Sequence, residues 1–227
     1  MQNKQKGIIL IFFSLIISNT YAQDWANFKQ FKDANSMLPL LRKGDSRIVF
    51  MGNSITIGWE ETHPEFFENK PYINRGISGQ TTPQMLVRFR ADVIDIGATT
   101  VVILAGTNDI AGNTGPVTLD MILNNLKSMA EIALANNVKV ILCSVLPAYD
   151  YPWSPKKHPN IKIPKLNSKI EKYSKKSGVY FLDYFKVLDN GNNGINKKYS
   201  YDGVHLTLEG YKLLEPLVEK AIKKVSK

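Results

Sequence analysis

The sequence predicts an α/β domain with three layers, in which helices cover both faces of a parallel sheet. Short apolar runs rich in Val and Ile alternate along the chain with longer segments of helical spacing. Strands that alternate with helices of this length favour right-handed crossovers and a parallel sheet. The apolar runs are also almost continuous, which is typical of strands that are covered on both faces.

The amino-terminal segment is set apart from this pattern. Lys4 and Lys6 precede an apolar run over residues 8–17, and small residues precede a cleavage site after Ala22. This arrangement predicts a secretory signal peptide over residues 1–22. A membrane anchor is the alternative, but it needs roughly 20 apolar residues, about twice this run. We therefore expect export to a periplasm or the extracellular space, with no stable membrane insertion after the segment is removed.

The remaining residues, 23–227, are long enough for one sizeable core, since 44% of the 227-residue chain is hydrophobic. We expect a single domain. Residues 1–22 hold two lysines and no acidic residue, so the net charge falls from +9 to +7 without them. A basic protein can attract nucleic acid, but the lysines are spread over predicted helices and no recognition motif accompanies them. No nucleic-acid partner is expected.

Cys143 is the single cysteine, so an intramolecular disulfide is excluded, and we expect Cys143 to be a buried thiol.

One of the expected helices has both a cap and an apolar face in its sequence. Thr118 can cap one of the helices, on which Leu119, Ile122, Leu126, Met129 and Ala133 share a face. The expected strands lie at 47–52, 71–76, 99–106, 138–145 and 178–184, and the expected helices at 25–41, 81–96, 118–136, 162–177 and 207–226.

Ligands of an open parallel sheet bind beyond the carboxyl ends of its strands. That rule selects the loops that follow the first four predicted strands, and these loops are rich in Gly, Ser, Asn and aromatic residues. In chain order they read GNSIT, GISGQTT, GTNDIAGNTG and LPAYDYPWSPKKHPN.

These loops hold candidates for nucleophilic catalysis. A serine nucleophile needs a general base, a group that orients the base, and donors for the oxyanion. The chain has three histidines, and one of them, His205, follows Asp202 by three residues. Asp202 could orient one imidazole nitrogen while the other takes the proton of Ser54. An Asp and a His at this spacing also commonly cap a helix, so the pair alone leaves both interpretations open.

Four motifs in order resemble those of the SGNH hydrolases, also called GDSL-like lipases and esterases. The likeness extends from about residue 46 to residue 226. The motifs are GNSIT with Ser54, NRGISGQTT with Gly79, GTND with Asn108, and DGVH with Asp202 and His205.

The resemblance implies a flavodoxin-like, five-stranded sheet and a role for each matched residue. Ser54 would be the nucleophile, His205 the general base and acid, and Asp202 the residue that orients His205. The backbone N–H groups of Ser54 and Gly79, with the amide of Asn108, would form the oxyanion hole. No cofactor is implied.

Two positions depart from familiar patterns. The first motif reads Gly-Asn-Ser, whereas the name of the family comes from Gly-Asp-Ser. Asn53 is therefore a candidate contact for the substrate, and no role in the reaction itself is assigned to it. Thr56 stands where the α/β-hydrolase pattern G-x-S-x-G needs its second glycine.

The segment DNGNNG (189–194) is similar to a calcium loop, but Gly191 and Ser200 stand where oxygen ligands are needed. We expect no metal site.

The long fourth loop supplies candidate substrate contacts, because binding residues concentrate on such loops. Tyr149, Tyr151 and Trp153 carry rings suited to sugar stacking, and His158 lies nearby in sequence. The first expectation is therefore an exported esterase that removes short acyl groups, mainly acetyl, from carbohydrates through a covalent acyl-enzyme. Two alternatives stay open: a lysophospholipase or thioesterase on longer acyl chains, and a noncatalytic glycan-binding protein. The sequence does not predict the oligomeric state.

Overall fold

The computed structural model describes residues 24–226, and it contains a parallel sheet of five strands. The strand order is β2-β1-β3-β4-β5, and every neighbouring pair runs parallel. This is the flavodoxin-like order, and the α/β fold predicted from the sequence is confirmed. The strands are β1 (Ile48–Gly52), β2 (Tyr72–Gly76), β3 (Thr100–Leu104), β4 (Lys139–Cys143) and β5 (Tyr180–Leu182).

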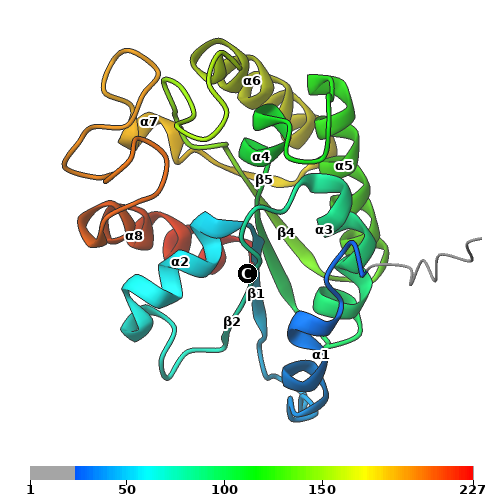
Figure 1. The fold of residues 1–227 in the computed structure, drawn as a ribbon. Helices are drawn as coiled ribbons and strands as arrows, with labels where there is room; N and C mark the ends of the chain where they lie inside the picture. Colours follow the sequence, from blue (N-terminus) through cyan, green and yellow to red (C-terminus); the bar gives the residue numbers. More distant parts are fainter. Residues whose placement is uncertain (1–23, 227) are drawn as a thin grey trace, which may run out of the picture.

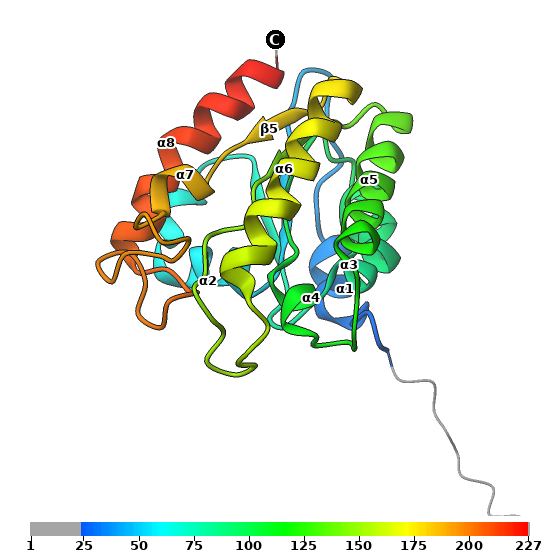
Figure 2. The ribbon, with the colours of Figure 1, turned by 90° about the horizontal axis from the view of Figure 1, so that it is seen from above.

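Helices cover both faces of the sheet (Figures 1 and 2). Successive strand residues point to opposite faces. Val49 and Met51 therefore pack with α3 (Thr82–Phe89), α5 (Leu119–Ala135) and α6 (Pro159–Ser177), whereas Ile48 and Phe50 pack with α2 (Ser54–Thr62) and α8 (Leu208–Val225). All five residues of β1 and of β3 are buried, as their continuous apolar runs predict. The longer helices are α1 (Lys29–Ser36), α2 (Ser54–Thr62), α3 (Thr82–Phe89), α5 (Leu119–Ala135), α6 (Pro159–Ser177) and α8 (Leu208–Val225).

Most expected helices form with shifted ends, and local chemistry explains the shifts. The first helix is shorter than expected: the Asp24 carboxylate accepts the amides of Phe28 and Lys29, and Pro39 follows the helix closely. The fourth expected helix, 162–177, begins at Pro159 in the structure. A proline fits the first turn because no N–H is needed there. Thr118 caps α5 as predicted, accepting the Met121 amide at 3.2 Å.

Some elements were not predicted from the sequence. The longest of these, α2, follows β1 after a single residue, and its short apolar stretch gave no clear helical period. The expected helix at 81–96 divides into α3 and a π-helical turn. The remaining short elements are η1 (Pro64–Phe66), η2 (Arg90–Ile94), α4 (Thr107–Ala111) and α7 (Phe185–Leu188).

Residues 1–22, the predicted signal peptide, lie outside the described residues. Between residues 24 and 226, no helix has the length and apolarity to span a bilayer. Cys143 is buried in β4, and this burial raises the pKa of its thiol.

Candidate functional site

Ser54 lies at the carboxyl end of β1, where the strand order reverses and parallel sheets of this type bind ligands. It is the first residue of α2. Asn53 caps this helix: its side chain accepts the Ile55 amide at 3.0 Å, and its carbonyl accepts the amides of Thr56 and Ile57. None of these bonds uses the Ser54 N–H, which is one of the amides that a helix start leaves without an intrahelical partner.

His205 and Asp202 complete a hydrogen-bonded chain that begins at Ser54. The Ser54 Oγ lies 2.9 Å from His205 Nε2, and His205 Nδ1 lies 2.6 Å from Asp202 Oδ2. The other carboxylate oxygen of Asp202 accepts the amides of Val204 and His205. Burial alone would raise the pKa of Asp202, but the bonds from the His205 ring and the two amides outweigh it, so the pKa lies below its ordinary value. Asp202 is therefore ionised and can hold the imidazole.

Gly79 lies in the loop after β2, and this strand ends close to the start of α2. At Gly76 the strand end passes so close to α2 that a Cβ would lie 2.3 Å from the Ile57 amide nitrogen. Gly79 has a φ of +76°, which favours glycine. Its carbonyl accepts from the Asn113 side chain at 3.0 Å, and the Asn108 Nδ2 donates to the neighbouring Gln80 carbonyl at 3.0 Å. Asn108 has a second Nδ2 hydrogen, which this bond does not use.

Buried polar groups fix this loop from below. Both oxygens of the Asp109 carboxylate accept the Thr82 amide at 3.0 Å, and one accepts the Thr82 hydroxyl at 2.5 Å. Burial raises the pKa of Asp109, partly offset by these bonds. Arg88, fully buried, pairs with Asp92 at 2.7 Å and donates to Gln80 Oε1 and the Gly52 carbonyl. The strand end before Ser54 and the loop before α3 are thus held by one guanidinium.

The aromatic loop after β4 divides into an exposed and a buried part. Trp153 is 43% exposed, and its ring centre lies 6.0 Å from that of His205. Its Nε1 lies 3.4 Å from Asn113 Oδ1, so the indole extends from the histidine toward the Gly79 loop. Tyr149 is exposed as well. Tyr151, which we expected to stack on a sugar, is fully buried beneath Trp153 with ring centres 5.1 Å apart, so it supports that ring instead.

Two other candidate substrate contacts occupy positions that differ from expectation. Asn53 is buried, and its side-chain oxygen accepts the Ile55 amide that begins α2, so this oxygen serves as a helix cap. His158 is exposed but precedes α6 in a left-handed conformation with a φ of +54°. Its carbonyl accepts the amides of Ile161 and Lys162 at the start of α6, and among the described residues no hydrogen bond or ring contact joins it to Ser54, His205 or Asp202.

Tyr201 was missed in the sequence analysis. It is 73% exposed, and its ring lies nearly parallel to the His205 ring with centres 5.9 Å apart. Trp153 and Tyr201 therefore both border the imidazole. The available signal was its place directly before Asp202 in the motif that carries the histidine.

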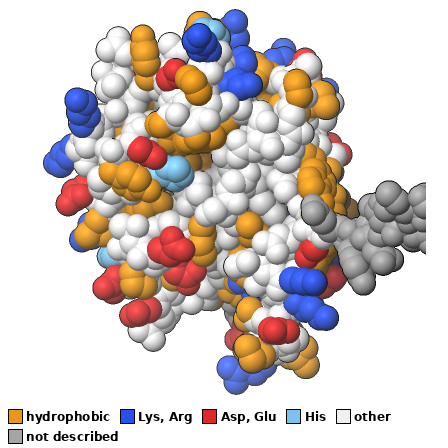
Figure 3. Space-filling view, viewed as in Figure 1, with side chains coloured by type: hydrophobic (Ala, Val, Ile, Leu, Met, Phe, Trp, Pro, Cys, Tyr) orange, Lys and Arg blue, Asp and Glu red, His pale blue; other side chains and the backbone are white. Residues whose placement is uncertain are grey.

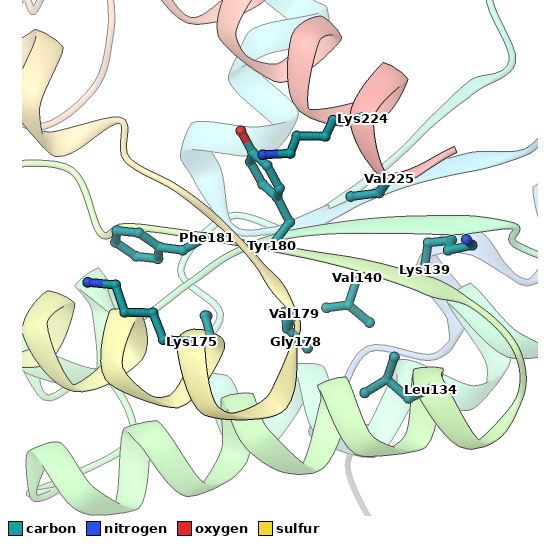
Figure 4. A pocket seen from close by; sticks show the side chains of 11 residues that line it. Leu134, Lys139, Val140, Lys175, Gly178, Val179, Tyr180, Phe181, Lys224 and Val225 are labelled. Atoms are coloured by element: carbon teal, nitrogen blue, oxygen red, sulfur yellow. The ribbon is translucent and has the colours of Figure 1, made fainter. Parts of the chain in front are cut away.

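Figure 1 views the molecule from the side of the loops that follow the strands and lead into α2, α4 and α8. In the space-filling view the centre of this side is mainly uncharged and hydrophobic, with an exposed histidine, whereas Lys and Arg gather toward the edges (Figure 3). A cavity of about 680 Å³ lies instead at the amino-terminal ends of β4 and β5, lined by Lys139, Tyr180 and Lys224 among others (Figure 4). Its position at the opposite end of the strands separates it from Ser54.

This geometry suits acyl transfer. An imidazole within hydrogen-bond distance of a serine hydroxyl can take its proton, and a carboxylate on the other ring nitrogen stabilises the imidazolium that forms. Within residues 24–226, no group of three or more His, Cys, Asp or Glu side chains is placed to hold a metal ion.

Comparison with known proteins agrees with this chemistry. Residues 50–213 match the model of the GDSL-like Lipase/Acylhydrolase family. A protein from Bacteroides fragilis described as an acylhydrolase is 46% identical; the alignment covers 90% of this chain and 100% of that one, with a TM-score of 0.88. A GDSL-like lipase from Bacteroides thetaiotaomicron is 48% identical, with 88% and 98% covered and a TM-score of 0.86.

A more distant structure shares the fold alone: an acetyl xylan esterase is 20% identical, with 78% of this chain and 99% of that chain covered and a TM-score of 0.62. No curated protein matches the sequence. The match of the family model over most of the chain, together with the two Bacteroides structures, shows that this chain belongs to the GDSL-like lipase/acylhydrolase (SGNH) family of ester hydrolases.

Proposed function

We propose that the protein is a serine esterase that removes short acyl groups, chiefly acetyl, from carbohydrates. The observation that carries the proposal is the continuous chain from Ser54 Oγ through the His205 ring to the Asp202 carboxylate, with links of 2.9 and 2.6 Å. In this proposal Ser54 attacks the ester carbonyl while His205 takes its proton. His205 then gives this proton to the departing sugar oxygen, which leaves as a hydroxyl, and a water activated by His205 hydrolyses the acyl-enzyme.

The oxyanion of each tetrahedral intermediate would be bound by three donors. These are the N–H groups of Ser54 and Gly79 and the second Nδ2 hydrogen of Asn108. Support comes from the capping of α2, which leaves the Ser54 amide unused, and from the Gln80 bond that orients the Asn108 amide. Neutral donors suit this task because they stabilise a developing negative charge without adding a full charge of their own.

A short acyl group and a sugar fit the surroundings of Ser54. The Trp153 indole extends from His205 toward Asn113, and in this proposal it borders the acyl group and restricts its length. The same exposed ring, with Tyr201 and Tyr149, offers flat amphipathic surfaces of the kind that stack on sugars. The protein with the same fold that is named an acetyl xylan esterase acts, by that name, on an acetylated glycan.

Acetate release from a panel of acetylated oligosaccharides tests the proposal directly. We expect release by the unmodified protein, none above background by Ser54→Ala, and normal release by the matched control Ser168→Ala, whose serine is exposed on α6. A series of nitrophenyl esters tests the acyl length. A maximum at acetate supports the proposal, whereas a maximum at eight carbons or more would favour a lysophospholipase or thioesterase. Oligosaccharide binding without any Ser54-dependent turnover would favour a noncatalytic protein.

We also propose that the chain is exported and that residues 1–22 are cleaved from a single catalytic domain. The basis is the sequence pattern of residues 1–22. Amino-terminal sequencing of the protein recovered from a cell envelope or culture medium would find a start near Gln23 if this is correct. An intact start at Met1 in the cytoplasm would contradict it.

A further inference from the structure

A cavity of about 350 Å³ lies between the aromatic loop after β4 and the loop that precedes His205. Asp202 forms part of its wall. Because Asp202 bonds to His205, and His205 bonds to Ser54, the cavity lies next to these three residues. Its size is at the low end of the range for small-molecule sites. It is therefore suited to a small ligand next to the reacting ester rather than to the ester itself.

The walls of this cavity are held in place by hydrogen bonds within the segment 190–194 and by its close packing against Tyr149. Asn190 Oδ1 accepts the amides of Asn192 at 2.9 Å and Gly194 at 3.3 Å, and the Gly194 carbonyl accepts the Asn190 amide. Gly194 packs so closely that a Cβ there would lie 3.3 Å from Tyr149 Cβ. The cavity is thus formed before any ligand binds, which reduces the entropy lost on binding.

The side chains around the cavity match the chemistry of a sugar. Tyr149 is 65% exposed at the rim and can present a ring face to the C–H groups of a pyranose. The Asp150 carboxylate, which accepts the Tyr151 amide at 2.9 Å, can also accept from sugar hydroxyls. The bonds to Asn190 Oδ1 leave its Nδ2 hydrogens to donate to a hydroxyl oxygen.

Charge restricts the kind of sugar. Asp150 and Asp202 are the charged side chains of the wall, and none of the described residues that line it is Lys or Arg. The carboxylate of a uronic acid would meet two like charges without a compensating cation, which is unfavourable in a partly desolvated cavity.

We propose that the cavity is a subsite for a neutral sugar unit adjacent to the acylated one. The inference rests on the proposed deacetylation and narrows its substrate class to neutral acetylated oligosaccharides. Tyr149 stacks on the sugar in the subsite, while Asn190 and Asp150 bond to its hydroxyls. A second cavity, on the α4 side, is lined by Lys157, Lys162 and Lys165. Preference for an acidic oligosaccharide would indicate that this lysine-lined cavity selects the substrate instead.

Calorimetric titration of the Ser54→Ala protein with xylotriose, mannotriose, galactotriose and trigalacturonate tests the subsite without turnover. We expect saturable binding of at least one neutral trimer and weaker or no binding of trigalacturonate. In the same background, Tyr149→Ala and Asn190→Ala should each weaken that binding about 3- to 10-fold. Tyr149→Phe should retain most of the affinity because it keeps the ring. Asn124→Ala, on the exposed surface of α5, is the matched control.

The outcomes separate this proposal from the proposed function. If the unmodified protein releases acetate but the Tyr149 and Asn190 variants bind the trimers as well as Ser54→Ala does, the subsite is refuted and the esterase remains. Absence of binding by every neutral trimer, or tighter binding of trigalacturonate, also refutes the subsite. If no ester is hydrolysed but a neutral trimer binds through Tyr149, the esterase is refuted and the sugar site remains.

Discussion

The two groups of loops that surround Ser54 are built differently: the Gly79 loop with the groups that hold it, and the loops that carry the aromatic rings beside His205. On the Gly79 side, buried polar groups such as Asn108, Asp109 and Arg88 bond to the backbone and to one another. On the opposite side, exposed rings of Trp153, Tyr201 and Tyr149 border His205 and the neighbouring cavity. A donor that must meet a developing charge needs a fixed position, whereas recognition of a sugar tolerates exposed surfaces. The difference predicts that changes on the buried side affect kcat and stability, and that changes on the exposed side affect KM.

The largest effect is expected at Asp202, which accepts a hydrogen bond from the His205 ring. Asp202→Asn keeps the size of the side chain but favours the wrong imidazole tautomer, so kcat should fall about 10⁴-fold. Asp33→Asn, at an exposed position of α1, is the control and should leave kcat unchanged. Steady-state kinetics on nitrophenyl acetate measure both. A loss of less than 10-fold would show that Asp202 is dispensable for orienting His205.

The pH dependence follows from the lowered pKa of Asp202. The carboxylate stays ionised in the folded protein below the ordinary Asp pKa of about 3.9. Its stabilising contribution is therefore complete above about pH 4 and is lost as the pH falls through the folded-state pKa. The melting temperature of Asp202→Asn should lie below that of the unmodified protein at pH 7, and the difference should shrink toward about pH 3. A difference that grew on acidification would contradict the assigned bonds.

Arg88 tests the buried side through stability. Arg88→Leu leaves the Asp92 carboxylate, 3% exposed, without its ion-pair partner. We expect the free energy of unfolding to fall by about 3–5 kcal/mol in chemical denaturation. The double variant Arg88→Leu with Asp92→Leu should recover part of this loss, because no charge is then left unpaired. A single variant within 1 kcal/mol of the unmodified protein would mean that the pair adds little to the rigidity of this side.

Asn108 tests the same side through catalysis. Asn108→Ala removes the proposed oxyanion donor together with the bond to the Gln80 carbonyl, so kcat should fall about 100- to 1,000-fold. KM should change much less, since the donor acts mainly on the tetrahedral intermediate. Asn124→Ala provides the comparison. A rise in KM at unchanged kcat would assign Asn108 to ground-state binding.

The smallest effect is expected on the exposed side, at Trp153. Trp153→Ala removes a ring that stacks on Tyr151 and borders His205. We expect KM for an acetylated oligosaccharide to rise about 3- to 10-fold while kcat changes less. A loss of kcat comparable with that of Asn108→Ala would show that the indole positions the imidazole, and the proposed division between the two sides would not hold.

The strands and most helices could be predicted because their signals are local. Continuous apolar runs marked β1, β3 and β4, and capping chemistry marked the start of α5. Elements with little local signal were missed: α2 starts one residue after β1, and its cap is the buried Asn53 that had been considered a substrate contact. Whether such a side chain caps a helix or meets a ligand depends on the groups around it, and these are brought there by the packing of distant segments.

The same limit applied to the candidate site. The motifs named Ser54, Gly79, Asn108, Asp202 and His205, because motif order is a property of the sequence. The sequence did not distinguish buried Tyr151 from exposed Trp153, and the position of Tyr201 directly before Asp202 did not show that its ring lies against His205.

By itself, the sequence determined the parallel α/β fold and which residue types end its strands, because periodicity and turn chemistry act over a few neighbouring residues. Only the tertiary structure decided which of those residues meet. Ser54 and His205 are separated by 151 positions yet lie within a hydrogen bond of each other. The buried bonds of Arg88 and Asn108, and the cavity beside Asp202, likewise arise from loops that come together only when the sheet packs against its helices.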